Sequence, residues 1–192
     1  MAHGLTTGTV MLTAGEFMEH PAAHERTELV RGRIHSMTPT GGSHGLVSGN
    51  VFRLLSTHVY AQRLGVCFAD STGYALPNLP NTVRAPDASF VREGRLPHDG
   101  IRGGWLELAP DLAVEVLSPS ESSREIEEKL ADYRVAGAPV VWVIDAVTRS
   151  VRVVVADGKE RLLAEGDVLS GDGVIPGFTC AVRELFEGLA PG

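Results

Sequence analysis

The sequence predicts an α/β protein in which helices flank a central mixed β-sheet. Three patterns support this class: an apolar run over residues 112–117, apolar side chains at helical spacing over 123–136, and a second apolar run over 140–145. A strand, a helix and a strand in this order form a βαβ unit with parallel strands. Because the last run is apolar at all but its final position, we expect both faces of its strand to be covered.

The N-terminal segment predicts a short helix and a β-hairpin. Thr13 stands three residues before an acid, which is the capping-box spacing, so it opens a helix over residues 14–19. Residues 28–37 are expected to form two strands that turn at Arg31 and Gly32. These elements precede the predicted βαβ unit and extend the sheet region of the protein.

A long helix and two strands are expected next. Ser43 is expected to cap a helix that ends near residue 63, because apolar side chains recur there at helical spacing. Residues 66–76 predict one strand with a bulge at Gly73, and residues 83–91 predict a second. Residues 92–108 are rich in glycine and charge, so they are expected to form a long loop.

Extra antiparallel strands are expected after the βαβ unit. Residues 151–155 add one strand, and short strands separated by Gly-Asp and Pro-Gly turns follow up to a helical turn at 183–186. The chain of 192 residues favours one domain, over 13–187, with flexible ends at 1–12 and 188–192.

Composition limits the class of protein. No apolar run reaches the length of a membrane span, and the N-terminus lacks the basic start and apolar stretch of a secretory signal. Cys67 and Cys180 have no metal-site spacing and indicate no disulfide framework. We therefore expect a soluble cytoplasmic protein. The net charge of -7 argues against a broad basic surface for nucleic acid, yet metal-binding acids themselves add negative charge at a nuclease site.

Two acids are unusual because they lie within apolar strands. Glu115 interrupts the run over 112–117, and Asp87 begins the apolar segment over 88–91. Burying a carboxylate is costly unless it is paired or bound to a metal. The two segments are far enough apart in the chain to form adjacent strands, so we expect Asp87 and Glu115 to share one site.

A lysine in the next helix is predicted to reach the same site. Ile126, Leu130 and Tyr133 define the buried face of this helix, and Lys129 borders that face. Two acids and a lysine suit hydrolysis of a phosphodiester with Mg²⁺ or Mn²⁺, because hard oxygen ligands hold such ions. The ion acidifies water and neutralises phosphoryl charge, while a lysine stabilises the charge that develops.

Five segments occur in a characteristic order along the chain: Glu28-Leu29 with the hairpin at Gly32, Pro86-Asp87, residues 114–120, Lys129 with Tyr133, and residues 141–145. In these segments the sequence resembles the Uma-two family of restriction endonucleases, in the PD-(D/E)XK nuclease superfamily. The resemblance extends from about residue 13 to residue 186. It implies a restriction-endonuclease-like core, a metal-dependent endonuclease acting on nucleic acid, with DNA favoured, and a homodimer.

The resemblance also implies roles for individual residues. Asp87 and Glu115 would be metal ligands, the backbone carbonyl of Val116 a third ligand, and Glu28 a further acid in or beside the site. The superfamily pattern places a lysine two residues after the second acid, where this sequence has Leu117. In this family that lysine is expected on the helix, at Lys129.

Structural alternatives exist for each of these residues. Asp87 can cap a turn, Glu115 can belong to a buried ion pair, and Lys129 can lie at the surface. His44 near a helix start can contact substrate phosphate, or be a polar first-turn residue. Tyr133 can contact substrate or pack in the core.

A second function, from a different class, is also compatible with the sequence. The fold can serve as a non-catalytic binding or assembly module in which the acids are structural. The lysine missing from its superfamily position and the acidic net charge favour this alternative.

Overall fold

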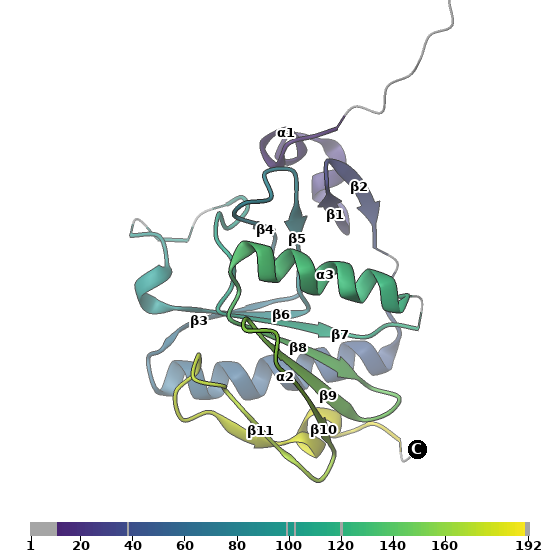
Figure 1. Cartoon of the computed structure of the whole chain (residues 1–192), viewed down its shortest axis with the longest axis vertical. Coiled ribbons are helices and arrows are strands. Elements are labelled where there is room, and N and C mark those ends of the chain that lie inside the picture. The colour runs from purple at the N-terminus through teal and green to yellow at the C-terminus, as the bar shows by residue number, and fades with distance from the viewer. Residues whose placement is uncertain (1–10, 38, 99, 102, 120, 191–192) are drawn as a thin grey trace, which may run out of the picture.

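Six strands form the central sheet, in the order β10-β9-β8-β7-β6-β3. Their bounds are β3 (Gly65–Ala69), β6 (Ala88–Arg92), β7 (Leu112–Val116), β8 (Val140–Asp145), β9 (Ser150–Val155) and β10 (Glu160–Ala164). The structure is a computed structural model that describes residues 11–190 except 38, 99, 102 and 120 (Figure 1). β7 and β8 are parallel and joined by α3 (Ser123–Ala136), while the other pairs are antiparallel. The predicted βαβ unit and mixed sheet are confirmed.

Helices cover both faces of this sheet (Figure 1). α2 (Gly42–Ala61) packs its buried valines and Leu55 against one face, in a core that includes Trp142 and Ile144 of β8. α3 packs Leu130 and Tyr133 against the other face, with Val141 and Val143. Alternate residues of β8 thus enter two different cores, which explains why its sequence is apolar throughout.

A second, four-stranded antiparallel sheet has the order β2-β1-β5-β4. Its strands are β1 (Thr27–Val30), β2 (Arg33–Ser36), β4 (Tyr74–Ala75) and β5 (Val83–Arg84). α1 (Ala14–Met18), capped by Thr13 as predicted, packs Phe17 onto Leu29 and Val83 of this sheet. The 3-10 helix η1 (Pro21–His24) leads into β1, and the predicted hairpin of β1 and β2 is confirmed.

The prediction of single strands over 66–76 and over 83–91 is wrong. Each segment is divided between the two sheets, because β3 and β6 belong to the large sheet and β4 and β5 to the small one. Gly73 lies in the turn between β3 and β4, and a Cβ atom there would lie 2.2 Å from the ring of Trp105. Close packing, rather than a bulge, therefore requires glycine at this position.

Smaller elements complete the chain. The helix predicted from Ser43 begins one residue earlier, at Gly42, with Gly41 as its N-cap and no side-chain cap. The loop after β6 contains η2 (Glu93–Arg95), and the C-terminal segment forms β11 (Val168–Ser170), β12 (Thr179–Ala181) and η3 (Val182–Phe186). The ends predicted to be flexible fall largely outside the described residues. Among the helices described, none is long and apolar enough to cross a bilayer.

Candidate active site

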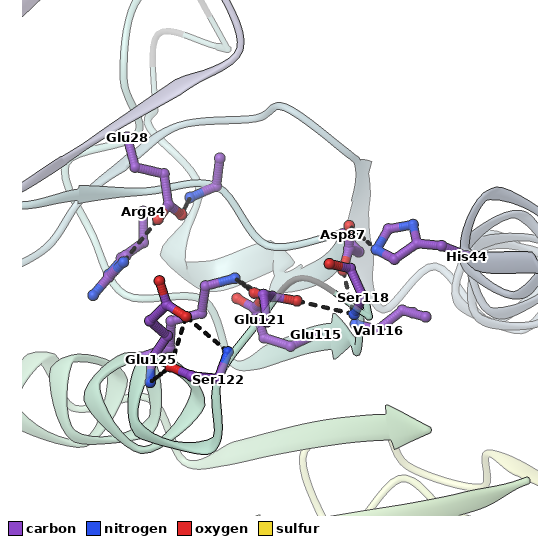
Figure 2. Close-up of polar contacts among 12 residues, drawn as sticks. Glu28, His44, Arg84, Asp87, Glu115, Val116, Ser118, Glu121, Ser122 and Glu125 are labelled. Carbon is purple, nitrogen blue, oxygen red and sulfur yellow. Dashed lines mark hydrogen bonds and ion pairs between the residues drawn. The ribbon is translucent and has the colours of Figure 1, made fainter. Parts of the chain in front are cut away.

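Asp87 and Glu115 lie side by side where the large sheet meets the small one. Asp87 directly precedes β6, and its N–H donates to the carbonyl of Val114 on β7 at 2.9 Å. Its Oδ2 accepts from the N–H of Val116 at 2.7 Å (Figure 2). Both acids are buried and line one pocket of about 300 Å³. The structure thus brings together the two acids that the sequence singled out.

Lys129 reaches this pocket from α3. Its Nζ lies 2.7 Å from Oε2 of Glu115 and 2.8 Å from Oε1 of Glu121. The hydroxyl of Tyr133, one turn further along the helix, donates to Oε1 of Glu115 at 2.7 Å. Tyr133 is fully buried and does not line the pocket, so its position does not fit the predicted contact with substrate. It orients Glu115 instead.

Glu121 is a site residue that sequence reasoning missed. It lines the pocket, and its Oε2 accepts from the N–H of Ser118 at 3.1 Å. It lies in the short segment between β7 and α3, just before the capping box of Ser122 and Glu125. The only signal in the sequence was an acid between the central strand and the lysine helix.

His44 lies in the site, on the first turn of α2. It is buried, and its Nε2 is 3.3 Å from Oδ1 of Asp87 (Figure 2). Burial alone lowers the pKa of His44, but the hydrogen bond and charge of Asp87, with smaller effects of Glu121 and Asp70, raise the pKa above its ordinary value. The predicted contact with substrate remains a prediction, while the contact with Asp87 makes His44 a partner of the first acid.

Glu28 lines the same pocket but is held by a buried ion-pair network. Its carboxylate accepts from Nη1 of Arg84 at 2.7 Å and from the N–H of Ala85 at 2.9 Å. Arg84 also pairs with Asp132 of α3, at 2.6 Å between Nη2 and Oδ2. Glu28, which the resemblance implies to lie in or beside the site, thus lines the pocket and is fixed by an arginine that the sequence did not single out.

The charges of the site are coupled. Burial raises the pKa of Glu115 to about 7; the ammonium of Lys129 opposes this shift, and the charges of Asp87 and Glu28 add to it. Burial lowers the pKa of Lys129, but Glu115, Glu28 and Glu121 together raise it well above its ordinary value. Lys129 therefore remains protonated. Burial also raises the pKa of Tyr133 well above its usual range, so the phenol remains a donor.

The donor chemistry of Asp87 and Glu115 fits Mg²⁺. In the described part of the chain, no group of three His, Cys, Asp or Glu side chains is arranged to hold a metal ion. Mg²⁺ keeps several waters and needs only one or two carboxylates, which these two residues supply. The charge of Asp87 raises the pKa of Glu115, so the two carboxylates repel each other, and a cation between them would relieve that repulsion.

A mixed sheet with paired acids at the ends of adjacent strands, and a lysine from the next helix, defines a nuclease-like α/β fold. The chain matches the model of the Uma2 family, described as "Putative restriction endonuclease", over residues 14–183, and it belongs to that family. The resemblance found in the sequence is confirmed. A search of curated proteins gives no match.

A solved structure supports the same fold. It is described as the crystal structure of "a putative nuclease belonging to DUF820" from Anabaena variabilis ATCC 29413. The two chains are 20% identical, the TM-score is 0.80, and the match covers 91% of this chain and 97% of the other. The predicted restriction-endonuclease-like fold class is thereby confirmed.

Proposed function

We propose that the protein is a metal-dependent endonuclease that hydrolyses phosphodiester bonds of nucleic acid, with DNA as the favoured substrate. One observation supports this function above the others. Asp87 and Glu115 enter one pocket from adjacent strands, and the ammonium of Lys129 lies 2.7 Å from Glu115. Membership of the Uma2 family agrees with this chemistry.

Asp87 and Glu115, with the backbone carbonyl of Val116, would hold Mg²⁺ or Mn²⁺. Such an ion, when bound, supplies Lewis acidity that acidifies a water molecule and offsets charge on the phosphoryl oxygens. The hydroxyl of Tyr133 fixes the carboxylate of Glu115, and His44 with the N–H of Val116 fixes that of Asp87. These hydrogen bonds hold both carboxylates at the pocket before any ligand enters.

Lys129 supplies a fixed positive charge beside the acids. Its raised pKa keeps the ammonium protonated, and it faces the pocket between Glu115 and Glu121. A positioned ammonium can orient the attacking water or stabilise negative charge that develops on the phosphoryl oxygens. From α3, Lys129 thus supplies the positive charge that a lysine on β7 would supply.

Cleavage of plasmid DNA and of a single-stranded oligonucleotide in Mg²⁺ and in Mn²⁺ tests this function. Glu115→Gln should reduce cleavage by about a hundredfold or more, because it removes one carboxylate charge while the shape is kept. Glu184→Gln, at an exposed side chain of η3, is the matched control. Equal cleavage by Glu115→Gln and the control would contradict the proposal.

A second candidate function is a non-catalytic binding or assembly module. One observation favours it: each carboxylate oxygen of Asp87 and Glu115 already has a partner within the chain. Cleavage assays with wild type and Lys129→Ala separate the two functions. Activity in wild type alone supports the nuclease, while activity in both or in neither removes Lys129 from the mechanism.

Two further expectations accompany this proposal. Family resemblance favours a homodimer, which sedimentation analysis of the purified chain can test. A cytoplasmic location agrees with Cys67 and Cys180, which are both free and buried.

A further inference from the structure

The hairpin of β1 and β2 presents one of its faces to the pocket. Glu28 and Val30 of β1 line the pocket, and in the antiparallel ladder they pair with His35 and Arg33 of β2. Residues directly opposite each other lie on the same face of a sheet. Arg33 and His35 therefore share the face of the pocket-lining residues. The opposite face carries Leu29, which packs in the small core with Phe17.

The β2 part of this hairpin face is open and carries one formal positive charge, on Arg33. Arg33 and His35 are both exposed, and β2 is an edge strand of the small sheet in the described part of the chain. Arg26, just before β1, also lines the pocket, but it pairs with Asp70 at 3.1 Å. The guanidinium of Arg33 and the imidazole N–H of His35 are available to a ligand, because neither side chain has a salt bridge to any described residue.

The opposite wall of the pocket is acidic. Glu121, Glu125 and Glu128, on α3 and the segment before it, line the pocket. A nucleic-acid strand carries one negative charge per nucleotide, so phosphates beyond the reach of Lys129 are attracted to Arg33 and repelled by Glu125 and Glu128. In Figure 1 the hairpin and the start of α3 lie on the same side of the molecule. Residues of both elements line the pocket.

We infer that β2 binds the sugar–phosphate backbone of the nucleic acid, with Arg33 and His35 donating to phosphate oxygens beside the scissile phosphate. Arg33 and His35 are two positions apart on β2, about 6.6 Å along the strand, so they can reach different phosphates of one backbone. These contacts are to phosphates rather than to bases, so binding through β2 does not depend on the nucleotide sequence. This inference rests on the proposed nuclease function and specifies which wall holds the substrate.

Fluorescence anisotropy with a labelled duplex and a labelled single strand tests the inference, with Ca²⁺ in place of Mg²⁺ so that binding is measured apart from hydrolysis. The variants are Arg33→Ala, Arg33→Ala with His35→Ala, and Arg183→Ala as control. Arg183 is exposed on η3, and the C-terminal segment lies at the end of the molecule opposite the hairpin (Figure 1). All three side chains are exposed, so the fold should be unaffected.

Arg33→Ala should weaken binding roughly tenfold at low salt and make the dependence of log K on log salt shallower by about one unit. The double variant should bind more weakly still, and Arg183→Ala should bind like wild type. Equal affinities and equal salt slopes for the double variant and Arg183→Ala would overturn the inference.

The outcome is independent of the test of catalysis. If the hairpin variants bind like the control but wild type cleaves and Glu115→Gln does not, only the inference about β2 fails. If the hairpin variants lose binding while Glu115→Gln cleaves like wild type, the binding surface stands and the proposed mechanism fails. Absence of any binding by wild type would overturn the inference about β2.

Discussion

The Nζ atom of Lys129 lies 2.7 Å from Oε2 of Glu115, although the two residues are 14 positions apart and belong to α3 and β7. The position two residues after Glu115 is taken by Leu117. Because Leu130 and Tyr133 pack against the sheet, Lys129 is carried over the end of β7. The ammonium group beside Glu115 thus comes from the next helix, and no lysine stands at the position two residues along the strand.

Replacing Lys129 should reduce both catalysis and the stability of the fold. Lys129→Met keeps most of the aliphatic volume but removes the charge, so cleavage should fall by about a hundredfold or more. The variant should also be less stable by about 3 kcal/mol, because Glu115 loses its cationic partner. Single-turnover cleavage and urea unfolding measure the two effects. Lys159→Met, at a side chain that is 81% exposed, is the control, and cleavage by Lys129→Met equal to this control would contradict the assigned role.

The hydroxyl of Tyr133 should affect the orientation of the Glu115 carboxylate but not the packing of the core. Tyr133→Phe removes the hydrogen bond to Oε1 of Glu115 and should cost about 1 kcal/mol of unfolding free energy. It should also weaken Mg²⁺ binding several-fold, because the carboxylate loses its fixed orientation.

Tyr74→Phe is the matched control for this variant. Tyr74 is also fully buried, and its hydroxyl lies 2.7 Å from the Oγ atom of Ser89. Its removal should reduce stability by a similar amount and leave Mg²⁺ binding unchanged. Calorimetry showing the same Mg²⁺ affinity in both variants would count against a role of Tyr133 in orienting Glu115.

The buried network around Arg84 should be among the most sensitive sites for stability. Arg84→Met leaves the carboxylates of Glu28 and Asp132 without their buried cation, which should cost about 3–5 kcal/mol. In a chain of this size the melting temperature should fall by roughly 10 °C. Arg124→Met, at a guanidinium that is 87% exposed, should change it by about 1 °C at most. Differential scanning calorimetry gives both values, and equal melting temperatures would show that the network contributes little.

The two cysteines should be unreactive in the folded protein. Burial raises the pKa of Cys67 and of Cys180 to about 12, so both thiols stay protonated at neutral pH. Iodoacetamide at pH 8 should label neither residue until guanidinium chloride is added, as mass spectrometry can show. Rapid labelling of the native protein would contradict the burial of these thiols.

The same shifts fix the sign of a pH effect on stability. The folded pKa is raised from the ordinary 9.0 to about 12, so between these values the unfolded chain binds fewer protons than the folded one. This contribution to stability is present in full below pH 9.0 and is lost as pH rises toward 12. Replacing both cysteines with alanine should make stability less dependent on pH in this range, as urea unfolding can measure.

Local patterns in the sequence predicted the parts of the fold that depend on local physics. The strand at 140–145 and the helix at 123–136 follow from apolar periodicity, and both are confirmed. The sequence predicts a shared site for Asp87 and Glu115 because a carboxylate within or beside an apolar strand needs a partner. It adds Lys129 because this residue borders the buried face of the next helix. Their convergence on one pocket agrees with that argument.

The pairing of strands and the packing of helices determine the features that the sequence does not show. Nothing local shows that the chain changes sheets between β3 and β4, since either sheet offers strand partners. Arg84 meets Asp132 across 48 positions, and His44 meets Asp87 only because α2 lies against β6 and β7. Such contacts follow from how the layers pack, and hydrophobic periodicity does not encode them.

Calorimetric titration of Mg²⁺ and Mn²⁺ into the purified protein tests the central claim most directly. The claim is that Asp87 and Glu115 jointly hold one cation. Wild type should bind the ion, and both Asp87→Asn and Glu115→Gln should lose binding while keeping a cooperative unfolding transition. Unchanged binding by both variants, or no binding by wild type, would contradict the account.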